Sequence, residues 1–367
     1  MKFPVLLLGL WLVPTAAIAE SGELRELLER ERHEQKMPGL RAAVIFPDGS
    51  MVLEAVGVAD KKKAIPLDND IGMPGGSTGK TFVAAVTMLL VEDGVLDLDE
   101  PVSKWLGDTG WYHELPNADD IRVRHLLEHS SGLPDYPGTA GFMSRMVWRA
   151  IRQGSAYFTP EELIGFSFGK RARHAAGQGY RYSDIGYLVL GQVIEAATDR
   201  TYYELLANKV LEPLGLEDIR PQDQSVLPDI ATGYSGGGSV LKKDGRMKFD
   251  PRSEWTGGGL VMTPAGLARF HRALADGALL KPESFAAMLD AGWRDTEDPD
   301  FYYGYGLFVA RDRSSWGHGG LWSGYRTHVA HLPHSGLTIA VQTNRDGRVD
   351  LIGLVGRIAR LVHAVPE

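Results

Sequence analysis

The sequence predicts an α+β protein in which one antiparallel sheet is built from both ends of the chain, with helices on its flanks and a mostly helical insertion. Residues 40–46 and 51–58 are short apolar runs around the turn Pro47-Asp48-Gly49-Ser50, which is the pattern of an antiparallel hairpin. Further short apolar runs with brief turns follow near the other end, at 306–311, 315–317, 327–332 and 337–343. The long apolar helical runs fall between these two groups, so one sheet with a helical insertion is the simplest architecture.

The expected helices follow from apolar periodicity. An amphipathic helix is expected over 20–36, ended by Pro38-Gly39, and residues 61–73 are expected to form a loop. The first long apolar helix, at about 77–92, is expected at the centre. Other helices are expected at 123–129, 142–153, 160–166, 185–197, 202–210, 264–275, 286–291 and 350–363. We therefore assign an α/β part to about 20–75 and 255–367 and a helical part to about 76–254.

Composition limits the possible functions. The chain has 367 residues, of which 44% are hydrophobic and 23% charged, as in ordinary globular proteins. A formal net charge of -8 argues against nucleic acid as a partner. There is no cysteine, so no disulfide braces the fold and no lipid can be attached to a cysteine.

Residues 1–19 have the pattern of a signal peptide. Lys2 is followed by an apolar stretch over 3–13 and by Ala17-Ile18-Ala19, an A-x-A cleavage site. A membrane anchor is the alternative, but the apolar stretch is short for a bilayer span. We expect a mature chain of residues 20–367 that is periplasmic or secreted and not stably inserted in a membrane after signal cleavage.

The first candidate for a catalytic site lies at the start of the first long helix, in the segment Pro74-Gly75-Gly76-Ser77-Thr78-Gly79-Lys80-Thr81. Residues i and i+3 of a helix share a face, so the Ser77 hydroxyl and the Lys80 amine are expected to meet. A serine nucleophile needs an adjacent base, and S-x-x-K is an acyl-enzyme motif. The segment also satisfies the hydrolase elbow G-x-S-x-G and half of a phosphate loop, or it is only a glycine-rich helix start.

The rest of the chain separates these interpretations. A phosphate loop needs glycine where Pro74 stands and a buried strand before it, but residues 64–73 are polar and contain a proline. The hydrolase elbow needs alternating strands and helices with a parallel sheet, which the order of elements does not provide.

Several further segments occur in an order that resembles one family. They are Gly94-Val95-Leu96-Asp97-Leu98-Asp99-Glu100-Pro101-Val102, His125-Leu126-Leu127-Glu128-His129-Ser130-Ser131-Gly132-Leu133-Pro134, Tyr182-Ser183-Asp184, Gly258-Gly259-Leu260-Val261-Met262-Thr263 and Trp316-Gly317-His318-Gly319-Gly320. With the Ser77 motif they resemble the serine β-lactamase and penicillin-binding-protein superfamily, in particular the branch near class C β-lactamases, DD-peptidases and related esterases. The resemblance covers about residues 39–344.

The resemblance implies a cycle of acylation and deacylation. Ser77 would attack a carbonyl, and water or another acceptor would release the acyl group. Lys80 and the Tyr182 phenol would share the proton transfer. The backbone N–H groups of Ser77 and Leu321 would hold the oxyanion. His318 stands where many members have a lysine, and it could polarise the tyrosine or bind a substrate carboxylate.

Positions 184 and 319 differ from the usual family pattern, and both differences bear on which substrate the protein accepts. Asp184 replaces the usual asparagine, and an ionised aspartate would hold Lys80 protonated and shift the task of the base toward Tyr182. Gly319 stands where β-lactamases place a threonine, with Gly320 after it, so one hydroxyl for a substrate carboxylate is missing. Efficient β-lactam hydrolysis is therefore the least favoured main role. The residues Ser183-Asp184-Ile185 do not match the S-D-N motif of class A β-lactamases, because Ile185 stands at the position of the asparagine.

Each candidate residue also has a structural interpretation. Tyr182 could belong to the core, Asp184 or Ser183 could cap a helix, and His318 could bond a strand carbonyl. The segment at 129–131 is expected to be a turn. His328, His331 and His334 are candidate metal ligands by residue type, but 328 and 331 face opposite sides of a strand, so no metal site is expected.

We conclude from the sequence that the protein is an exported serine hydrolase acting through Ser77 on a D-amino-acid peptide, a small ester or a β-lactam. We expect the protein to be a monomer, with no metal, no cofactor and no nucleic-acid partner. The alternatives are a transacylase and a catalytically silent relative that binds peptidoglycan-like or acyl ligands. Specificity is expected from the loops at 136–156 and 223–252.

Overall fold

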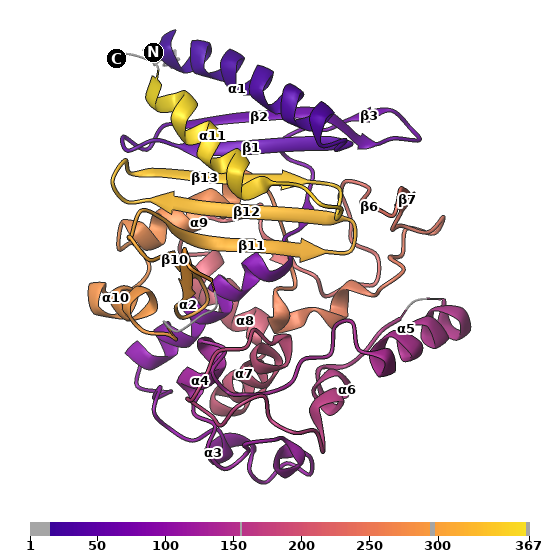
Figure 1. The fold of residues 1–367 in the computed structure, drawn as a ribbon, viewed down its shortest axis with the longest axis vertical. Coiled ribbons are helices and arrows are strands. Elements are labelled where there is room, and N and C mark those ends of the chain that lie inside the picture. The colour runs from indigo at the N-terminus through magenta and orange to yellow at the C-terminus, as the bar shows by residue number, and fades with distance from the viewer. Residues whose placement is uncertain (1–14, 155, 294–297, 365–367) are drawn as a thin grey trace, which may run out of the picture.

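The sheet predicted from both chain ends is present in the computed structural model, which describes residues 15–154, 156–293 and 298–364. Eight strands lie in the order β3-β2-β1-β13-β12-β11-β10-β9, and every neighbouring pair is antiparallel. The hairpin of β1 and β2 joins the C-terminal strands through the β1–β13 pair, in which Ala43 lies opposite Ala340 (Figure 1). The strands are β1 (Gly39–Ile45), β2 (Met51–Asp60), β3 (Ile65–Pro66), β9 (Phe301–Tyr303), β10 (Phe308–Ala310), β11 (Trp316–Trp322), β12 (Tyr325–Leu332) and β13 (Leu337–Thr343).

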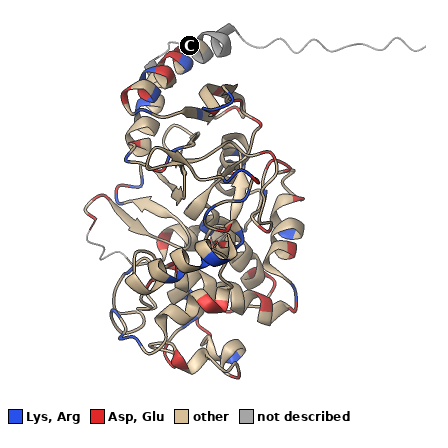
Figure 2. Ribbon diagram, turned by 90° about the vertical axis from the view of Figure 1, so that its right-hand side faces the viewer, with Lys and Arg blue, Asp and Glu red and all other residues tan. Residues whose placement is uncertain are grey.

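Helices cover both faces of this sheet. The N-terminal helix α1 (Thr15–Glu34) and the C-terminal helix α11 (Leu351–Ala364) pack together on one face, where Leu28 and Leu354 are buried with the apolar residues of β1 and β13 (Figure 1). The other face packs on α9 (Pro264–Ala275) and on the first long helix, α2 (Gly79–Glu92). Charged side chains are spread over the helices and loops of the side drawn in Figure 2.

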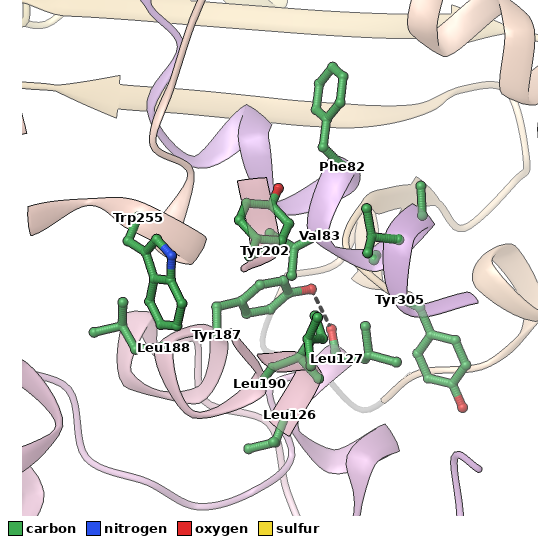
Figure 3. Packing of buried hydrophobic residues seen from close by; sticks show 14 of the residues in the cluster. Phe82, Val83, Leu126, Leu127, Tyr187, Leu188, Leu190, Tyr202, Trp255 and Tyr305 are labelled. Carbon is green, nitrogen blue, oxygen red and sulfur yellow. Dashed lines mark hydrogen bonds between the residues drawn. The ribbon is translucent and has the colours of Figure 1, made fainter. Parts of the chain in front are cut away.

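The segment between the two sheet-forming ends is mostly helical, as predicted. Its helices are α2, α3 (Ser103–Leu106), α4 (Val123–Leu127), α5 (Ala140–Gln153), α6 (Pro160–Ile164), α7 (Asp184–Thr198) and α8 (Tyr202–Leu206), and α10 (Pro282–Asp290) follows α9. The core lies between α2 and α7, where the Tyr187 hydroxyl donates to the Leu127 carbonyl at 2.8 Å (Figure 3). Phe82 of α2 stacks on Phe270 of α9 with ring centroids 3.6 Å apart, which joins the helical core to the sheet.

The structure differs from the predictions mainly at short elements. The expected loop at 61–73 contains β3, and its end begins a small sheet of β4 (Met73–Pro74), β8 (Leu260–Met262) and β5 (Arg220–Pro221). The helix expected at 202–210 is α8 followed by one π turn over Ala207–Leu211. The first helix spans Thr15–Glu34 rather than 20–36, and residues 1–14 of the expected signal peptide lie outside the described residues. Within the described ranges, no helix is both long and apolar enough to cross a bilayer.

Candidate active site

Ser77 lies in a short 3-10 turn, η1 (Gly76–Thr78), directly before α2. Glycines allow the backbone of other elements to approach it from two sides. A Cβ on Gly76, which has φ +57°, would lie 2.7 Å from the Leu321 backbone, and one on Gly79 would lie 2.6 Å from the backbone of Gly258. The glycine-rich sequence around Ser77 is therefore needed for close packing between β11 and the 257–259 segment, with the serine between them.

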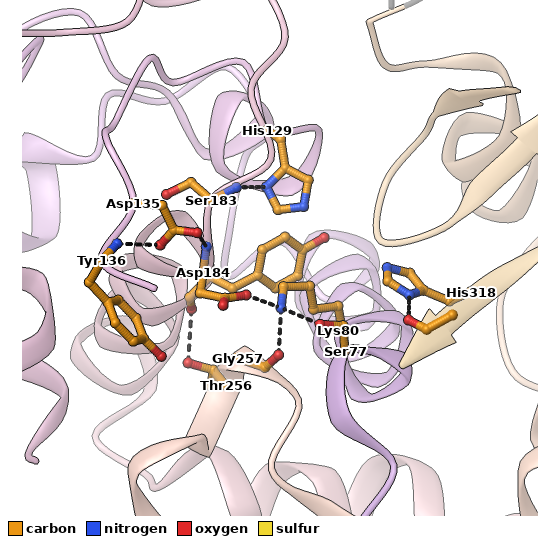
Figure 4. Close-up of polar contacts among 12 residues, drawn as sticks. Ser77, Lys80, His129, Asp135, Tyr136, Ser183, Asp184, Thr256, Gly257 and His318 are labelled. Atoms are coloured by element: carbon orange, nitrogen blue, oxygen red, sulfur yellow. Dashed lines mark hydrogen bonds and ion pairs between the residues drawn. The ribbon is translucent and has the colours of Figure 1, made fainter. Parts of the chain in front are cut away.

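Lys80 lies one helical turn after Ser77, as its spacing predicted, and its side chain has no exposed surface. Its ammonium group donates to Asp184 Oδ1 at 2.6 Å, to the Gly257 carbonyl at 2.5 Å and to Ser77 Oγ at 3.3 Å (Figure 4). These three acceptors match the three protons of an ammonium. Burial lowers the pKa of Lys80, but the Asp184 carboxylate acting together with Tyr182 and Glu254 outweighs burial and raises it. The predicted effect of Asp184 on Lys80 is thus present, whereas the alternative that Asp184 or Ser183 caps α7 is wrong, because no side-chain cap bond forms there.

Tyr182 precedes α7 and lies close to both Ser77 and Lys80. The Lys80 ammonium is 5.1 Å from the centre of the Tyr182 ring. The phenol oxygen is buried and has no hydrogen-bond partner of good geometry in the described part of the chain. Burial raises the pKa of Tyr182 to about 12, although the Lys80 charge and the proximity of Ser77 act in the opposite direction. At ordinary pH the Tyr182 side chain is therefore a neutral phenol, and its oxygen lies beside Ser77 without another hydrogen-bond partner in the described residues.

The edge of the sheet beside Ser77 is the second half of β11. Strand β10 pairs only with Trp316 and Gly317, so within the described residues no strand covers β11 on that side from His318 to Trp322. Gly320 lies against the serine turn, since a Cβ there would be 1.9 Å from the Gly75 carbonyl oxygen, whereas a Cβ on Gly319 would meet only His328 Nδ1, at 3.4 Å. Leu321 follows with a half-exposed residue surface. In the described residues this part of β11 therefore has no strand partner on the side next to Ser77, although the Gly319 carbonyl accepts from His318.

His318 is buried, and its hydrogen bonds differ from those we expected. Its Nδ1 donates to the carbonyl of Gly319 at 2.6 Å, so Nε2 accepts from the Tyr303 hydroxyl at 2.9 Å. Its ring centre is 6.4 Å from that of Tyr182, and no hydrogen bond joins the two. Burial lowers the pKa of His318 to about 3, so the ring is neutral at ordinary pH. A neutral, carbonyl-bonded ring is not a cationic substitute for the lysine of other members, which corrects the expectation that it attracts a substrate carboxylate.

Two carboxyl groups that sequence reasoning missed lie beside Asp184. Asp135 accepts hydrogen bonds from the backbone N–H groups of Asp184 and Tyr136, and burial followed by the charge of Asp184 raises the pKa of Asp135 to about 7 (Figure 4). Glu254 is 8% exposed and lies next to Gly257, whose carbonyl accepts from Lys80. Burial and then the charge of Asp184 raise the pKa of Glu254 to about 8. Three carboxyl groups therefore surround one ammonium.

His129 is a further residue that sequence reasoning missed. It was expected in a turn, and its φ of +58° agrees with one, but its ring is buried against Tyr182 with centroids 4.1 Å apart. Its Nδ1 accepts from the Ser183 backbone N–H at 3.2 Å. Burial holds the pKa of His129 well below its usual value, so the ring is neutral. His129 thus fixes both the ring and the backbone of the Tyr182 segment.

A cavity of about 320 Å³ opens from Ser77 along β11. Its wall is mostly apolar with one arginine and one aspartate; it is lined by Ser77, Tyr182, Phe308, His318, Gly319, Gly320, Leu321, Arg326, Thr327, His328, Val349, Asp350, Leu351 and Ile352. The structure thus brings together Ser77, Tyr182, His318 and Leu321 from three separate segments, because His318 and Leu321 both belong to β11. Within the described residues, no cluster of three His, Asp or Glu side chains is arranged to hold a metal ion.

Known proteins share both this sequence pattern and this fold. The family model described as Beta-lactamase matches residues 24–362. The chain belongs to the Beta-lactamase family. It is 25% identical to penicillin-binding protein 4* of Bacillus subtilis (strain 168), covering 83% of this chain and 68% of that protein. It is also 25% identical to esterase EstB of Burkholderia gladioli, covering 90% and 93%.

A solved structure extends the similarity to three dimensions. The D-amino acid amidase from Ochrobactrum anthropi SV3 superposes with a TM-score of 0.78 and 26% identity, covering 94% of this chain and 99% of that one. The predicted family and fold are confirmed, and the chain is a hydrolase of the β-lactamase fold.

Proposed function

We propose that this β-lactamase-family protein is an exported, periplasmic or secreted serine hydrolase that forms an acyl-enzyme on Ser77. The observation that carries the proposal is the meeting of Ser77, Lys80 and Tyr182 beside the uncovered edge of β11. In the proposed cycle the Ser77 hydroxyl attacks a substrate carbonyl. The backbone N–H groups of Ser77 and Leu321 stabilise the oxyanion, and one such donor is worth about 3 kcal/mol of barrier.

Proton transfer is assigned to Tyr182 rather than to Lys80. An ammonium whose three protons already go to Asp184, Gly257 and Ser77 has no lone pair with which to accept another. Its charge opposes the effect of burial on Tyr182, whose pKa is about 12, and so makes the minor phenolate form easier to reach. That phenolate takes the Ser77 proton and then gives it to the leaving group as the acyl-enzyme forms. Deacylation repeats the transfer with water as the nucleophile.

The charge around Ser77 supports a substrate with a free amine. Asp135 and Glu254 have no cation of their own within the described residues, because Lys80 is paired with Asp184. Their raised pKa values leave both carboxyl groups partly or mostly protonated at neutral pH, and a protonated amine on the substrate would favour their ionised forms. By contrast, a neutral His318 and a glycine at 319 give little for a substrate carboxylate at these two positions, and the cation that lines the cavity is Arg326 of the neighbouring strand β12. We therefore favour the amide of a D-amino acid or a short D-peptide with a free amino group over a β-lactam, in keeping with the D-amino acid amidase of similar structure.

Matched substrates test this proposal. Alanine p-nitroanilide would be assayed in its D and L forms, each with a free and an acetylated amine, beside p-nitrophenyl acetate and a cephalosporin. We expect the free D-amine to have the highest kcat/KM among the amides, and Glu254→Gln to lower that preference while leaving hydrolysis of the ester nearly unchanged. Equal rates for the free and the acetylated amide would contradict the assignment of an amine.

Assays on the same purified protein also distinguish two alternative functions. A transacylase would show faster release of p-nitrophenol and a new amide when an amine acceptor is added. A silent binding protein would give no turnover and no adduct with any acylating probe. The presence of the complete Ser77, Lys80 and Tyr182 arrangement favours hydrolysis over both.

A further inference from the structure

Helix α5 exposes an apolar side that no other described residue covers. Ten large apolar side chains are exposed among the described residues, and four of them lie on this one helix: Met143 (42%), Val147 (50%), Trp148 (56%) and Ile151 (76%). Residues 143, 147 and 151 are spaced four apart, so they form one stripe along the helix, with Trp148 beside it. A contiguous apolar patch of this kind marks an interaction surface.

The stripe is held on a well-formed helix. Thr139 caps its start by accepting from the Phe142 N–H, and Gly154, with φ +77°, ends it. The inner side is anchored by Phe142, whose ring packs 4.8 Å from that of Tyr136, and by Arg149, which is paired with Glu162. Figure 1 shows α5 extending away from the helical part, and Figure 2 turns that side toward the viewer. The outward direction of the stripe is thus fixed by packing.

The charge of α5 points to one kind of partner. The helix sequence AGFMSRMVWRAIRQ contains three arginines and no acidic residue, although the whole chain has a net charge of -8. Arg145 and Arg152 are exposed, and the Arg152 guanidinium lies 5.9 Å from the Trp148 ring. A helix with tryptophan and aliphatic residues on one side, flanked by arginine, has the composition of helices that lie in the interface of anionic membranes. A two-fold contact between two copies of α5 would bring the arginines of both helices into one interface that contains no acidic residue of α5 to pair with them, which disfavours self-association.

We propose that the outer side of α5 docks on the surface of an anionic lipid bilayer. The apolar stripe enters the headgroup boundary, and Arg145 and Arg152 contact the lipid phosphates. Because Phe142 packs on Tyr136, and Tyr136 follows Asp135 of the active site, docking holds the cleft of the enzyme near the bilayer. This goes beyond the proposed hydrolase activity and does not depend on it.

Vesicle co-sedimentation tests the proposal directly. The full mature protein would be spun with vesicles of phosphatidylcholine alone and with vesicles of equal phosphatidylcholine and phosphatidylglycerol. We expect binding to the anionic vesicles only, weakened by salt, with tryptophan emission shifting to shorter wavelength. Trp148→Ser and Ile151→Ser should each lower the partition coefficient at least about tenfold, since each removes a large apolar contact. Arg152→Glu should weaken binding to the anionic vesicles specifically.

Controls make each outcome decisive. Ile65→Ser removes an isoleucine that is 43% exposed on β3, far along the chain from α5, and should bind as the wild type does. All variants should keep the wild-type rate with p-nitrophenyl acetate, which shows that they are folded. Absence of binding to anionic vesicles, or binding that the α5 substitutions leave unchanged, would overturn the proposal. So would light scattering that shows a dimer abolished by Trp148→Ser, because the stripe would then be occupied by a second copy.

Discussion

Replacing Asp184 by asparagine perturbs the charge on Lys80 while keeping the shape of the side chain. The two groups are 2.6 Å apart, the Lys80 side chain has no exposed surface, and that of Asp184 is 22% exposed. Removing one partner of a buried ion pair costs about 3–5 kcal/mol, because the other charge is left uncompensated. Asp135 and Glu254 remain nearby, so we expect about 3 kcal/mol of lost stability at neutral pH.

The sign of the pH dependence follows from Lys80. In the wild type its pKa is raised, so the stabilisation is present below the pKa of an unfolded lysine and is lost only as the pH rises through the higher folded value. Asp184→Asn removes the largest of the charges that oppose burial, so the pKa of Lys80 falls. The stability deficit of the variant should therefore shrink as the pH rises toward the pKa of an unfolded lysine. A neutral Lys80 can also act as a base, so the acidic limb of kcat/KM should move to lower pH.

Two assays check these expectations. Urea unfolding followed by fluorescence gives the stability at several pH values, and p-nitrophenyl acetate hydrolysis gives kcat/KM across the pH range. Asp119→Asn is the matched control, because its side chain is 90% exposed. An unchanged acidic limb in Asp184→Asn would refute the reasoning, since the charge of Asp184 would then not govern the proton that leaves Ser77.

Three further substitutions follow from the same geometry. Tyr182→Phe should lower kcat by about 10²–10⁴-fold with little change in urea unfolding, because the hydroxyl has no partner in the described structure; a near-wild-type kcat would remove Tyr182 from proton transfer. Glu254 has a folded pKa of about 8, so its contribution to stability falls as the pH rises from about 5 to about 8, by up to about 1.4 kcal/mol per pH unit. In urea unfolding, Glu254→Gln should reduce the loss of unfolding free energy between these pH values, and an unchanged dependence on pH would contradict the raised pKa of Glu254. Gly320→Ala places a Cβ 1.9 Å from the Gly75 oxygen, so it should lower the free energy of unfolding by about 2 kcal/mol and remove most activity. Gly319→Ala is the control and should be tolerated. Equal effects of the two substitutions would contradict the packing of β11 on the serine turn.

The parts of the fold that the sequence predicted are those with local patterns. The hairpin of β1 and β2 has two apolar runs around a Pro-Asp-Gly turn, and β13 is a buried apolar strand. The strands β3, β4 and β5 have only two residues each, which is too short to show the alternation of apolar and polar residues that identifies a strand. Their pairing depends on segments far along the chain, such as β4 with β8, so only the tertiary fold defines them.

The candidate site divides in the same way. Ser77 and Lys80 could be paired from helical spacing alone, and Tyr182 and the β11 segment from the resemblance to a family. Asp135 and Glu254 carry no such spacing, because they reach Asp184 from loops more than a hundred residues apart. Their only trace in the sequence is an acidic residue after Leu133-Pro134 and another before the glycine run at 257–259.

Labelling with a fluorophosphonate tests the role of Ser77 most directly. Intact mass spectrometry of the wild type should show one adduct, peptide mapping should place it on Ser77, and Ser77→Ala should remain unmodified. An adduct that persists in Ser77→Ala, or that maps to another serine, would contradict the account.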